Sequence, residues 1–268
     1  MTDGPISMLT TELLLRCTFP VAGTHVQCAV SGGADSLALM LLAHAAGLHV
    51  TAVHIDHGLR HDSSLDKDVI QPIADSLGIT VQIHSVHIKD GPNLEARARE
   101  ARYGIFAPET MTGHTADDQA ETVLINLLRG AGAQGLSAMK PGNTRPLLAL
   151  RRSETHALCA ELGITPVDDY TNSDPRFLRN RVRHELLTLM TDISQRDPVP
   201  LLARTADVLR SDNDLLDELA AQLDPTDALA LAAATTLFSD SPFALASAAA
   251  LSISSASALL SASASSFA

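Results

Sequence analysis

The sequence contains no tryptophan, and aromatic residues make up only 3% of its 268 residues. The core must therefore be built from Leu, Ala, Val and Ile, which supply most of the 46% hydrophobic content. No uninterrupted apolar run reaches the roughly 20 residues that a membrane-spanning helix needs, and no basic segment precedes an apolar stretch at the N-terminus. These absences predict a cytoplasmic protein that does not associate with membranes.

Cysteine is also scarce. The three cysteines, Cys17, Cys28 and Cys159, are odd in number and far apart, and no Cys-x-x-Cys motif occurs. This pattern disfavours zinc binding, iron–sulfur clusters and persulfide chemistry. Buried, reduced thiols are the expected state of all three.

Positive charge is in short supply, with a net charge of −12. Residues 211–268 contain seven acidic residues and no Lys or Arg, so the other 210 residues carry a net charge of only −5. The overall charge argues against non-specific binding of nucleic acid. A nearly neutral body can still carry a local basic surface.

What the sequence does contain is a strand, a glycine turn and a helix in direct succession. The apolar run from Val26 to Val30 predicts a buried strand, Ser31-Gly32-Gly33 interrupts it, and apolar residues then recur at helical spacing from Asp35 onward. The free N–H groups at such a helix start form an anion site. A carboxylate such as Asp35 repels phosphate unless a metal lies between them, which favours Mg²⁺. The alternative is an Asp/Ser cap on an ordinary turn.

Strands alternate with helices along the first part of the chain. Further strands are predicted over residues 48–55, 79–88, 110–113 and 145–150. Helices are predicted over residues 6–16, 65–77, 94–106, 116–129 and 153–162. This order predicts an α/β fold with a doubly wound, mostly parallel sheet, whose ligands bind at the carboxyl ends of the strands.

The character of the chain changes after Asp168. Residues 171–225 are expected to form an arginine-rich linker and a small helical extension, with helices over residues 186–190 and 199–223. Residues 226–268 are a low-complexity tail of Ala, Ser and Leu, which we do not expect to form a stable domain. The predicted catalytic domain is therefore residues 1–170.

Several motifs in fixed order resemble one family. The turn Ser31-Gly32-Gly33-Ala34-Asp35-Ser36 resembles the loop shared by N-type ATP pyrophosphatases, the PP-loop proteins. The narrower matches are Asp56-His57-Gly58-Leu59-Arg60, the segment from Asn93 to Tyr103, Gly113-His114-Thr115-Ala116-Asp117-Asp118-Gln119-Ala120-Glu121-Thr122, Arg145-Pro146-Leu147-Leu148, and the segment from Asn172 to Arg183. Together, over about residues 26–190, they resemble the bacterial tRNA(Ile)-lysidine synthetases.

The resemblance implies a fold similar to the adenine nucleotide alpha hydrolases and an ATP-dependent ligase. Its partners would be ATP with Mg²⁺, free L-lysine, and an isoleucine tRNA with the anticodon CAU. The C2 oxygen of the first anticodon cytidine would attack the α-phosphorus of ATP, and the ε-amine of lysine would then displace AMP to give lysidine. The resemblance leaves a homodimer open.

The resemblance also implies roles for residues of the glycine turn. Ser31, Gly32, Gly33, Ala34 and Ser36 would hold the ATP phosphates, and Asp35 would bind Mg²⁺ and take part in catalysis. His57 and His114 would contact the nucleotide. The alternative for His57 is a plain turn after the second strand.

Two carboxylates of the predicted 116–129 helix are the expected amine site. Asp118 and Glu121 are three residues apart and so share a helix face, where they would bind the lysine ammonium, help to deprotonate it and hold metal. Asp117 points elsewhere and is expected to cap the helix. The alternative for the pair is a solvated helix face.

Two groups of arginines complete the expected site. Arg99 and Arg102 would meet phosphate or the cytidine, unless they pair with neighbouring glutamates. A second group would contact the tRNA backbone, or else pair with aspartates at positions 168, 169 and 174 to staple the linker. Its members are Arg176, Arg179, Arg181 and Arg183.

Two further expectations follow. Pro108 should end the 94–106 helix early and shorten the sheet near the carboxylates.

The alternative functions are another PP-loop enzyme acting on tRNA and a catalytically inactive nucleotide-binding homologue.

Overall fold

The structure is a computed structural model that describes residues 7–56, 63–85, 106–167 and 174–222. The chain divides into two compact units. The first comprises residues 1–121 and 139–200, and the second comprises residues 122–138 and 201–268.

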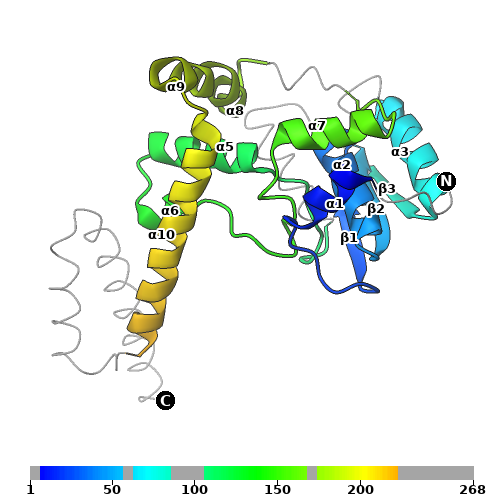
Figure 1. Cartoon of the computed structure of the whole chain (residues 1–268), viewed down its shortest axis with the longest axis horizontal. Coiled ribbons are helices and arrows are strands. Elements are labelled where there is room, and N and C mark those ends of the chain that lie inside the picture. The colour runs from blue at the N-terminus through cyan, green and yellow to red at the C-terminus, as the bar shows by residue number, and fades with distance from the viewer. Residues whose placement is uncertain (1–6, 57–62, 86–105, 168–173, 223–268) are drawn as a thin grey trace, which may run out of the picture. The chain divides into compact units, whose positions relative to one another are not determined.

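A parallel three-stranded sheet lies at the centre of the first unit (Figure 1). Its strands are β1 (His25–Ala29), β2 (His49–Asp56) and β3 (Thr80–Ser85), in the order β1-β2-β3. Cys28 pairs with Ala52, and Ala52 pairs in turn with Val81. The helices α2 (Ala34–Ala45) and α3 (Ser63–Leu77) connect consecutive strands, as parallel pairing requires. The predicted α/β class with a parallel sheet is confirmed.

Helix α2 is the centre of the hydrophobic core. Most of its apolar side chains are buried, and Leu37, Leu39 and Leu42 are completely so. The helices α1 (Met8–Leu14) and α7 (Arg152–Glu161) both pack against α2, and α7 adds Leu158 to the core. The burial of α2 on nearly every side explains why its sequence is apolar throughout rather than amphipathic.

The predicted fourth strand is reduced to one residue. Met111 forms an isolated parallel bridge with Cys28, in which Met111 N–H donates to the Gln27 carbonyl and Ala29 N–H donates to the Met111 carbonyl. Ala107 and Pro108 precede it in a turn rather than a helix. The expected shortening next to Pro108 is therefore present. The predicted 94–106 helix lies almost entirely outside the described residues.

The predicted fifth strand over residues 145–150 is wrong. The segment is a run of turns, in which Leu148 N–H donates to the Arg145 carbonyl and Leu150 N–H donates to the Leu147 carbonyl. Leu147 and Leu150 are both completely buried. Their spacing of three matches the turns, whereas a strand would place them on opposite faces. Pro146 also has no N–H to give to a ladder.

The other regular elements of the described chain are helices. The first unit contains the start of α5 (Ala116–Leu128), α8 (Leu178–Arg181), the π-helical turn η2 (Val182–Leu186), α9 (Leu187–Ser194) and the first residues of α10 (Pro198–Ala221). The second unit contains the rest of α5, α6 (Ala133–Leu136) and the rest of α10. The helix α6 falls in a glycine-rich stretch for which the sequence predicted no helix.

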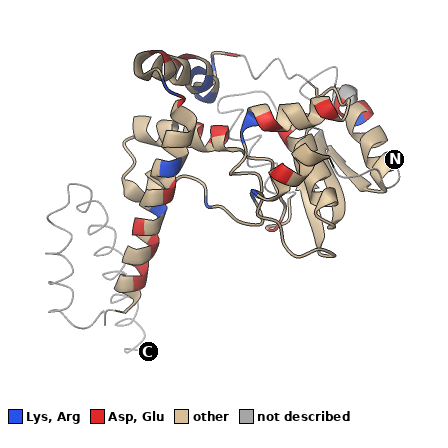
Figure 2. Cartoon of the chain, viewed as in Figure 1, with Lys and Arg blue, Asp and Glu red and all other residues tan. Residues whose placement is uncertain are grey.

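Side-chain to carbonyl hydrogen bonds connect the second unit internally. Asn126 donates to the Gly135 carbonyl, and Arg210 donates to the Ser137 carbonyl. Acidic residues dominate the C-terminal half of α10 (Figure 2). None of the described helices combines the length and the apolar character needed to cross a membrane. The tail over residues 226–268 lies outside the described residues.

Candidate active site

The glycine turn leads directly from β1 into α2. Gly32 has a φ of +84°, a left-handed conformation that favours glycine, and Gly33 is the N-cap of α2 but offers no side chain to cap it. The Ser31 N–H donates to Ser36 Oγ over 3.0 Å, and Ser36 Oγ donates to the Gly33 carbonyl over 2.9 Å. The first turn of α2 therefore has N–H groups that no side chain caps, and two hydroxyls lie beside them. Such a group of donors can bind an anion.

Neighbouring segments hold this turn in place. A Cβ atom on Gly113 would lie 2.6 Å from the carbonyl oxygen of Asp35, so only glycine permits this approach. On another side, Val167 N–H donates to the Gly32 carbonyl over 3.0 Å. His54 of β2 is buried and its Nδ1 lies 2.8 Å from the Val30 carbonyl. Contacts with Gly113, Val167 and His54 thus hold the backbone of the glycine turn and the end of the strand before it in one conformation.

Arg152, the first residue of α7, connects the turn to α5. Its guanidinium contacts three carboxylates that we call the carboxylate cluster: Asp35, Asp118 and Glu121. The Nε atom lies 3.4 Å from Asp35, while the two terminal nitrogens lie 3.0 Å from Asp118 and 3.2 Å from Glu121. One turn further along α7, the Thr155 hydroxyl donates to Asp35 over 2.5 Å. The N-terminal turn of α7 therefore brings the loop carboxylate and the two α5 carboxylates together.

The α5 carboxylates share a face, as predicted from their spacing. Asp118 accepts hydrogen bonds from the N–H and the hydroxyl of Thr115, at 2.9 and 3.0 Å. The Glu121 side chain is completely buried and accepts two bonds from Arg183, at 2.6 and 3.2 Å. Arg179 lies 3.5 Å from the same carboxylate. The pair is not a solvated helix face.

The predicted role of Asp117 as the cap of its own helix is wrong. Its carboxylate accepts from the N–H of Arg152 over 2.8 Å and from the side chain of Arg151, and so caps α7 instead. Asp118 caps α5 instead, because its carboxylate accepts a hydrogen bond from the N–H of Thr115, the residue just before α5. The bonds of Asp117 to Arg151 and Arg152 therefore decide which of the two adjacent aspartates caps which helix.

The pKa values of the clustered aspartates shift in opposite directions. Burial raises the pKa of Asp35 above its ordinary value, and the nearby charge of Asp118 adds to the rise. Burial acts in the same direction on Asp118, but Arg152, His114 and the Thr115 N–H outweigh it and lower the pKa of Asp118. The carboxylates raise the pKa of Arg152 further above its usual range, so its guanidinium stays charged. Asp118 is consequently ionised at neutral pH.

The four arginines of the linker fall into two pairs. Arg179 and Arg183 turn toward the carboxylate cluster. Arg176 pairs with Asp174, and Arg181 pairs with Glu185 one helical turn away. Both Arg176 and Arg181 are exposed.

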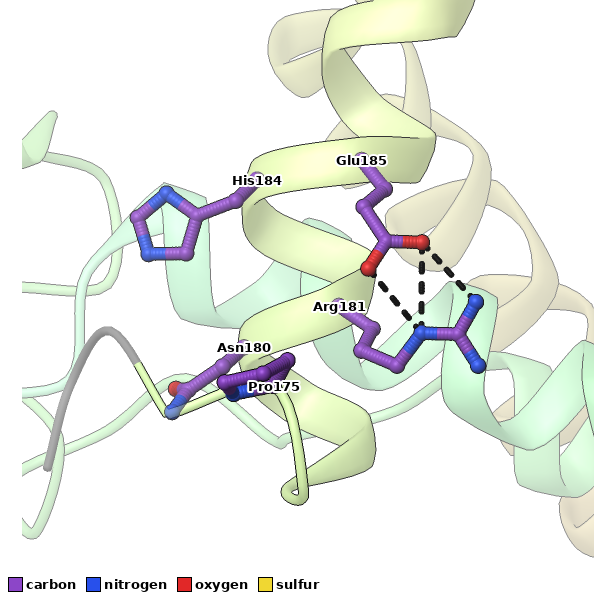
Figure 3. Close-up of a pocket in the computed structure, with 5 residues that line it drawn as sticks. All are labelled: Pro175, Asn180, Arg181, His184 and Glu185. Carbon is purple, nitrogen blue, oxygen red and sulfur yellow. Dashed lines mark hydrogen bonds and ion pairs between the residues drawn. The ribbon is translucent and has the colours of Figure 1, made fainter.

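A pocket lies on the exposed side of α8 and η2 (Figure 3). Arg181 and Glu185 lie together on one side of the helix and bond to each other, whereas His184 extends to the opposite side (Figure 3). Asn180 lines the pocket as well, and its amide donates to the Asp174 carbonyl over 2.9 Å. None of the pocket residues belongs to the carboxylate cluster.

Comparisons with known proteins identify the family. A family model described as a PP-loop domain matches residues 10–190. A tRNA(Ile)-lysidine synthase from Mycolicibacterium paratuberculosis is 47% identical over 226 residues, which cover 81% of this chain and 70% of that protein. The chain belongs to the tRNA(Ile)-lysidine synthase family of PP-loop proteins. A synthase of the same name from Rhodococcus erythropolis is 44% identical, with 74% of this chain and 64% of that protein covered.

A solved structure supports the fold independently. A U34-tRNA thiolase from Methanococcus maripaludis superposes with a TM-score of 0.59 at 16% identity, covering 75% of this chain and 78% of that chain. The similarity shows that the two chains share a PP-loop fold. Burial disfavours thiolate chemistry at the cysteines of this family member, because desolvation raises the pKa of Cys28 to about 12 and that of Cys159 to about 11. Cys28 and Cys159 are buried as expected, whereas Cys17 is only half-buried, although desolvation raises its pKa to about 12 as well.

Sequence reasoning missed several residues of this family member's site. Arg152 and Thr155 were not predicted, although they follow the Arg145-Pro146-Leu147-Leu148 motif by only a few residues. An arginine at the start of a helix is common and gives no signal of a functional role. The role of Arg152 depends on which acidic side chains lie next to it in the folded chain. His54 was also missed, and its Nε2 is buried without a hydrogen-bond partner in the part of the chain that the structure describes.

The remaining predicted residues are placed as follows. His114 lies 2.8 Å from the Thr112 hydroxyl through Nδ1, in the segment between the Met111 bridge and α5. His57, Arg99 and Arg102 lie outside the described residues. Among the described residues, no group of three or more His, Cys, Asp or Glu side chains is arranged to hold a metal ion.

Proposed function

We propose that the protein forms lysidine at the first anticodon position of an isoleucine tRNA that carries the anticodon CAU. ATP would adenylate the C2 oxygen of the cytidine and release pyrophosphate, and the ε-amine of free lysine would then displace AMP. The single observation that carries this proposal is the carboxylate cluster. In this cluster, Arg152 connects Asp35 of the glycine turn to the acids Asp118 and Glu121 of α5. The glycine turn would bind an anion, and the two acids would bind an amine.

The loop end of the cluster suits the triphosphate. The uncapped start of α2 and the hydroxyls of Ser31 and Ser36 would bind phosphate oxygens, and Gly32, Gly33 and Ala34 would let the backbone approach them closely. Asp35 offers the hard carboxylate oxygens that Mg²⁺ prefers, and Mg²⁺ usually takes one or two carboxylates together with substrate phosphates. Bound there, Mg²⁺ would neutralise charge on the leaving pyrophosphate.

The α5 end of the cluster suits the amine. The lowered pKa of Asp118 keeps it ionised, so it can bind the ammonium group of lysine. Glu121 lies one turn away on the same face, and the pair would accept the proton that the amine must lose before it attacks. Both groups contact the guanidinium that also contacts Asp35, so the amine site adjoins the loop.

The linker would meet the tRNA. Arg176 and Arg181 are exposed and, among the described residues, each pairs with one neighbouring acid, which phosphate can replace. Arg179 and Arg183 could contact tRNA only by giving up part of their contact with Glu121.

For four other residues we retain the roles implied by the resemblance. The histidines His57 and His114 would contact the nucleotide, and the arginines Arg99 and Arg102 would contact phosphate or the cytidine. We place the reaction in the cytoplasm.

The test is the incorporation of radiolabelled lysine into isoleucine tRNA with the anticodon CAU, in the presence of ATP and Mg²⁺. Methionine tRNA with the same anticodon is the control. We expect label in the isoleucine tRNA alone, and none with Glu121→Gln. The absence of label from both tRNAs, with ATP still bound, would contradict the proposal and favour an inactive nucleotide-binding protein.

A further inference from the structure

Among the described residues, the carboxylate cluster is already neutralised. Three guanidiniums face its three carboxylates: Arg152 contacts all three, and Arg179 and Arg183 contact Glu121. An ammonium ion is attracted to carboxylates whose charge is uncompensated, and an additional cation among compensated pairs gains little. A guanidinium must therefore withdraw before the cluster binds the amine of a substrate.

Arg152 is held more weakly at each carboxylate than Arg183. It gives one nitrogen to each carboxylate, at distances from 3.0 to 3.4 Å. Arg183 instead makes two bonds to the completely buried Glu121, the shorter of them 2.6 Å. Two-point guanidinium–carboxylate bonds are the stronger kind, so Arg183 is the fixed partner of Glu121. Arg179 contacts Glu121 alone, at 3.5 Å, so its withdrawal would free neither aspartate. Arg152 is the guanidinium whose withdrawal would release contacts to all three carboxylates, and we therefore take it as the exchangeable one.

The departure of Arg152 would also leave each carboxylate with another partner. Glu121 keeps Arg183, Asp118 keeps both hydrogen bonds from Thr115, and Asp35 keeps the Thr155 hydroxyl. A buried carboxylate with no partner would be costly, but none results here. The Arg152 side chain is 21% exposed, so it already has access to solvent.

We propose that Arg152 is an internal occupant of the amine site, whose guanidinium holds the carboxylate cluster until the ammonium group of the substrate lysine displaces it. This inference rests on the proposed function, because it takes Asp118 and Glu121 as the amine site. It makes Arg152 a positioning residue that competes with substrate.

The position of Arg152 predicts that nucleotide binding assists the exchange. Its Nε lies 3.4 Å from Asp35 at the start of α2, beside the loop at which phosphate is proposed to bind. A guanidinium binds phosphate readily, so a nucleotide gives it a new partner away from Asp118 and Glu121. Nucleotide should therefore raise the affinity of the protein for lysine.

The experiment is a calorimetric titration of L-lysine into the full chain, with Mg²⁺ throughout, without nucleotide and with a non-hydrolysable ATP analogue. Arg152→Gln is the test variant. Arg151→Gln is the matched control, since Arg151 lies beside it but pairs with Asp117 and Asp197 outside the cluster. We expect Arg152→Gln to bind lysine about tenfold more tightly than the unmodified protein without nucleotide, the size of a typical coupling between sites. The effect of nucleotide should be lost in Arg152→Gln and kept in Arg151→Gln.

The opposite results would overturn the inference. A purely structural Arg152 would leave lysine affinity unchanged or weaken it in Arg152→Gln. If that variant does not fold, Arg152→Lys replaces it, because an ammonium can engage fewer of the three carboxylates at once and should compete less; lysine binding no tighter than in the unmodified protein would then reject the inference. If the unmodified protein binds no lysine in either state, the proposed function fails instead.

Discussion

Arginine ion pairs occur in two regions of the first unit that differ in burial. In the carboxylate cluster, Arg152 and Arg183 surround a completely buried Glu121. On the surface of α8 and η2, the Arg181 and Glu185 side chains are 58% and 54% exposed. The same residue type thus appears in two settings within a few residues of chain.

The difference shows what each setting allows an arginine to do. A buried carboxylate keeps its guanidinium because an unpaired charge is costly there, so Arg183 is committed to shaping the site. An exposed pair contributes little because water and salt screen it, so Arg181 is free to exchange its partner for a phosphate. In the proposed function, the half-buried arginines of the cluster would organise the chemistry and the exposed ones would bind the RNA.

Replacement of Arg183 should have the largest effect. Arg183→Gln removes the two-point partner of Glu121 and leaves this buried carboxylate with the longer contacts of Arg152 and Arg179, so we expect a loss of about 2–3 kcal/mol in the free energy of unfolding. Arg181→Gln, two residues away, should leave that free energy unchanged. Urea unfolding of both variants measures the contrast, and equal losses would show that the two regions do not differ.

The aspartates of the cluster allow a subtler test within the buried region. Asp118→Asn removes a carboxylate that accepts hydrogen bonds from Thr115 and Arg152, and should cost about 2 kcal/mol at neutral pH. Because the pKa of Asp118 is lowered in the folded protein, its ionisation stabilises the fold above the ordinary aspartate pKa. That stability is lost as the pH falls through the lowered value, so the variant and the unmodified protein should converge in acid.

Asp35→Asn should change the free energy of unfolding in the opposite direction to Asp118→Asn. The raised pKa of Asp35 means that its ionised form destabilises the fold at neutral pH, a cost that disappears as the pH falls through the raised value. The variant should therefore be at least as stable as the unmodified protein at neutral pH while losing lysine incorporation. Thermal unfolding of both asparagine variants across the acid range measures this. A clear loss of stability in Asp35→Asn at neutral pH would contradict it.

The smallest effect is expected at the surface. Arg176→Gln and Arg181→Gln should each weaken tRNA binding modestly and lower the slope of log affinity against log salt by about one, as the loss of one phosphate contact predicts. Filter binding over a range of salt concentrations measures the slope. An unchanged slope in both variants would assign the exposed pairs to the stapling of the linker instead.

Local patterns sufficed to predict much of the fold. The apolar runs around β1, β2 and β3, with helical spacing between them, predicted a parallel sheet, and the three strands lie within a few residues of their predicted positions. The turn from Ser31 to Ser36 and the shared face of Asp118 and Glu121 also follow from spacing alone. The 145–150 segment failed because a short apolar run fits a strand and a buried series of turns equally well.

The sequence by itself determined the family, the phosphate-type loop and the pair of acids, because these depend on contiguous residues and helical periodicity. Only the tertiary structure decided which charges meet. It showed that Asp117 caps α7, that Arg179 and Arg183 turn inward while Arg181 does not, and that Arg152 joins Asp35 to Asp118 and Glu121. These pairings join residues as many as 117 positions apart, so they depend on how α2, α5 and α7 pack, and no local pattern encodes them.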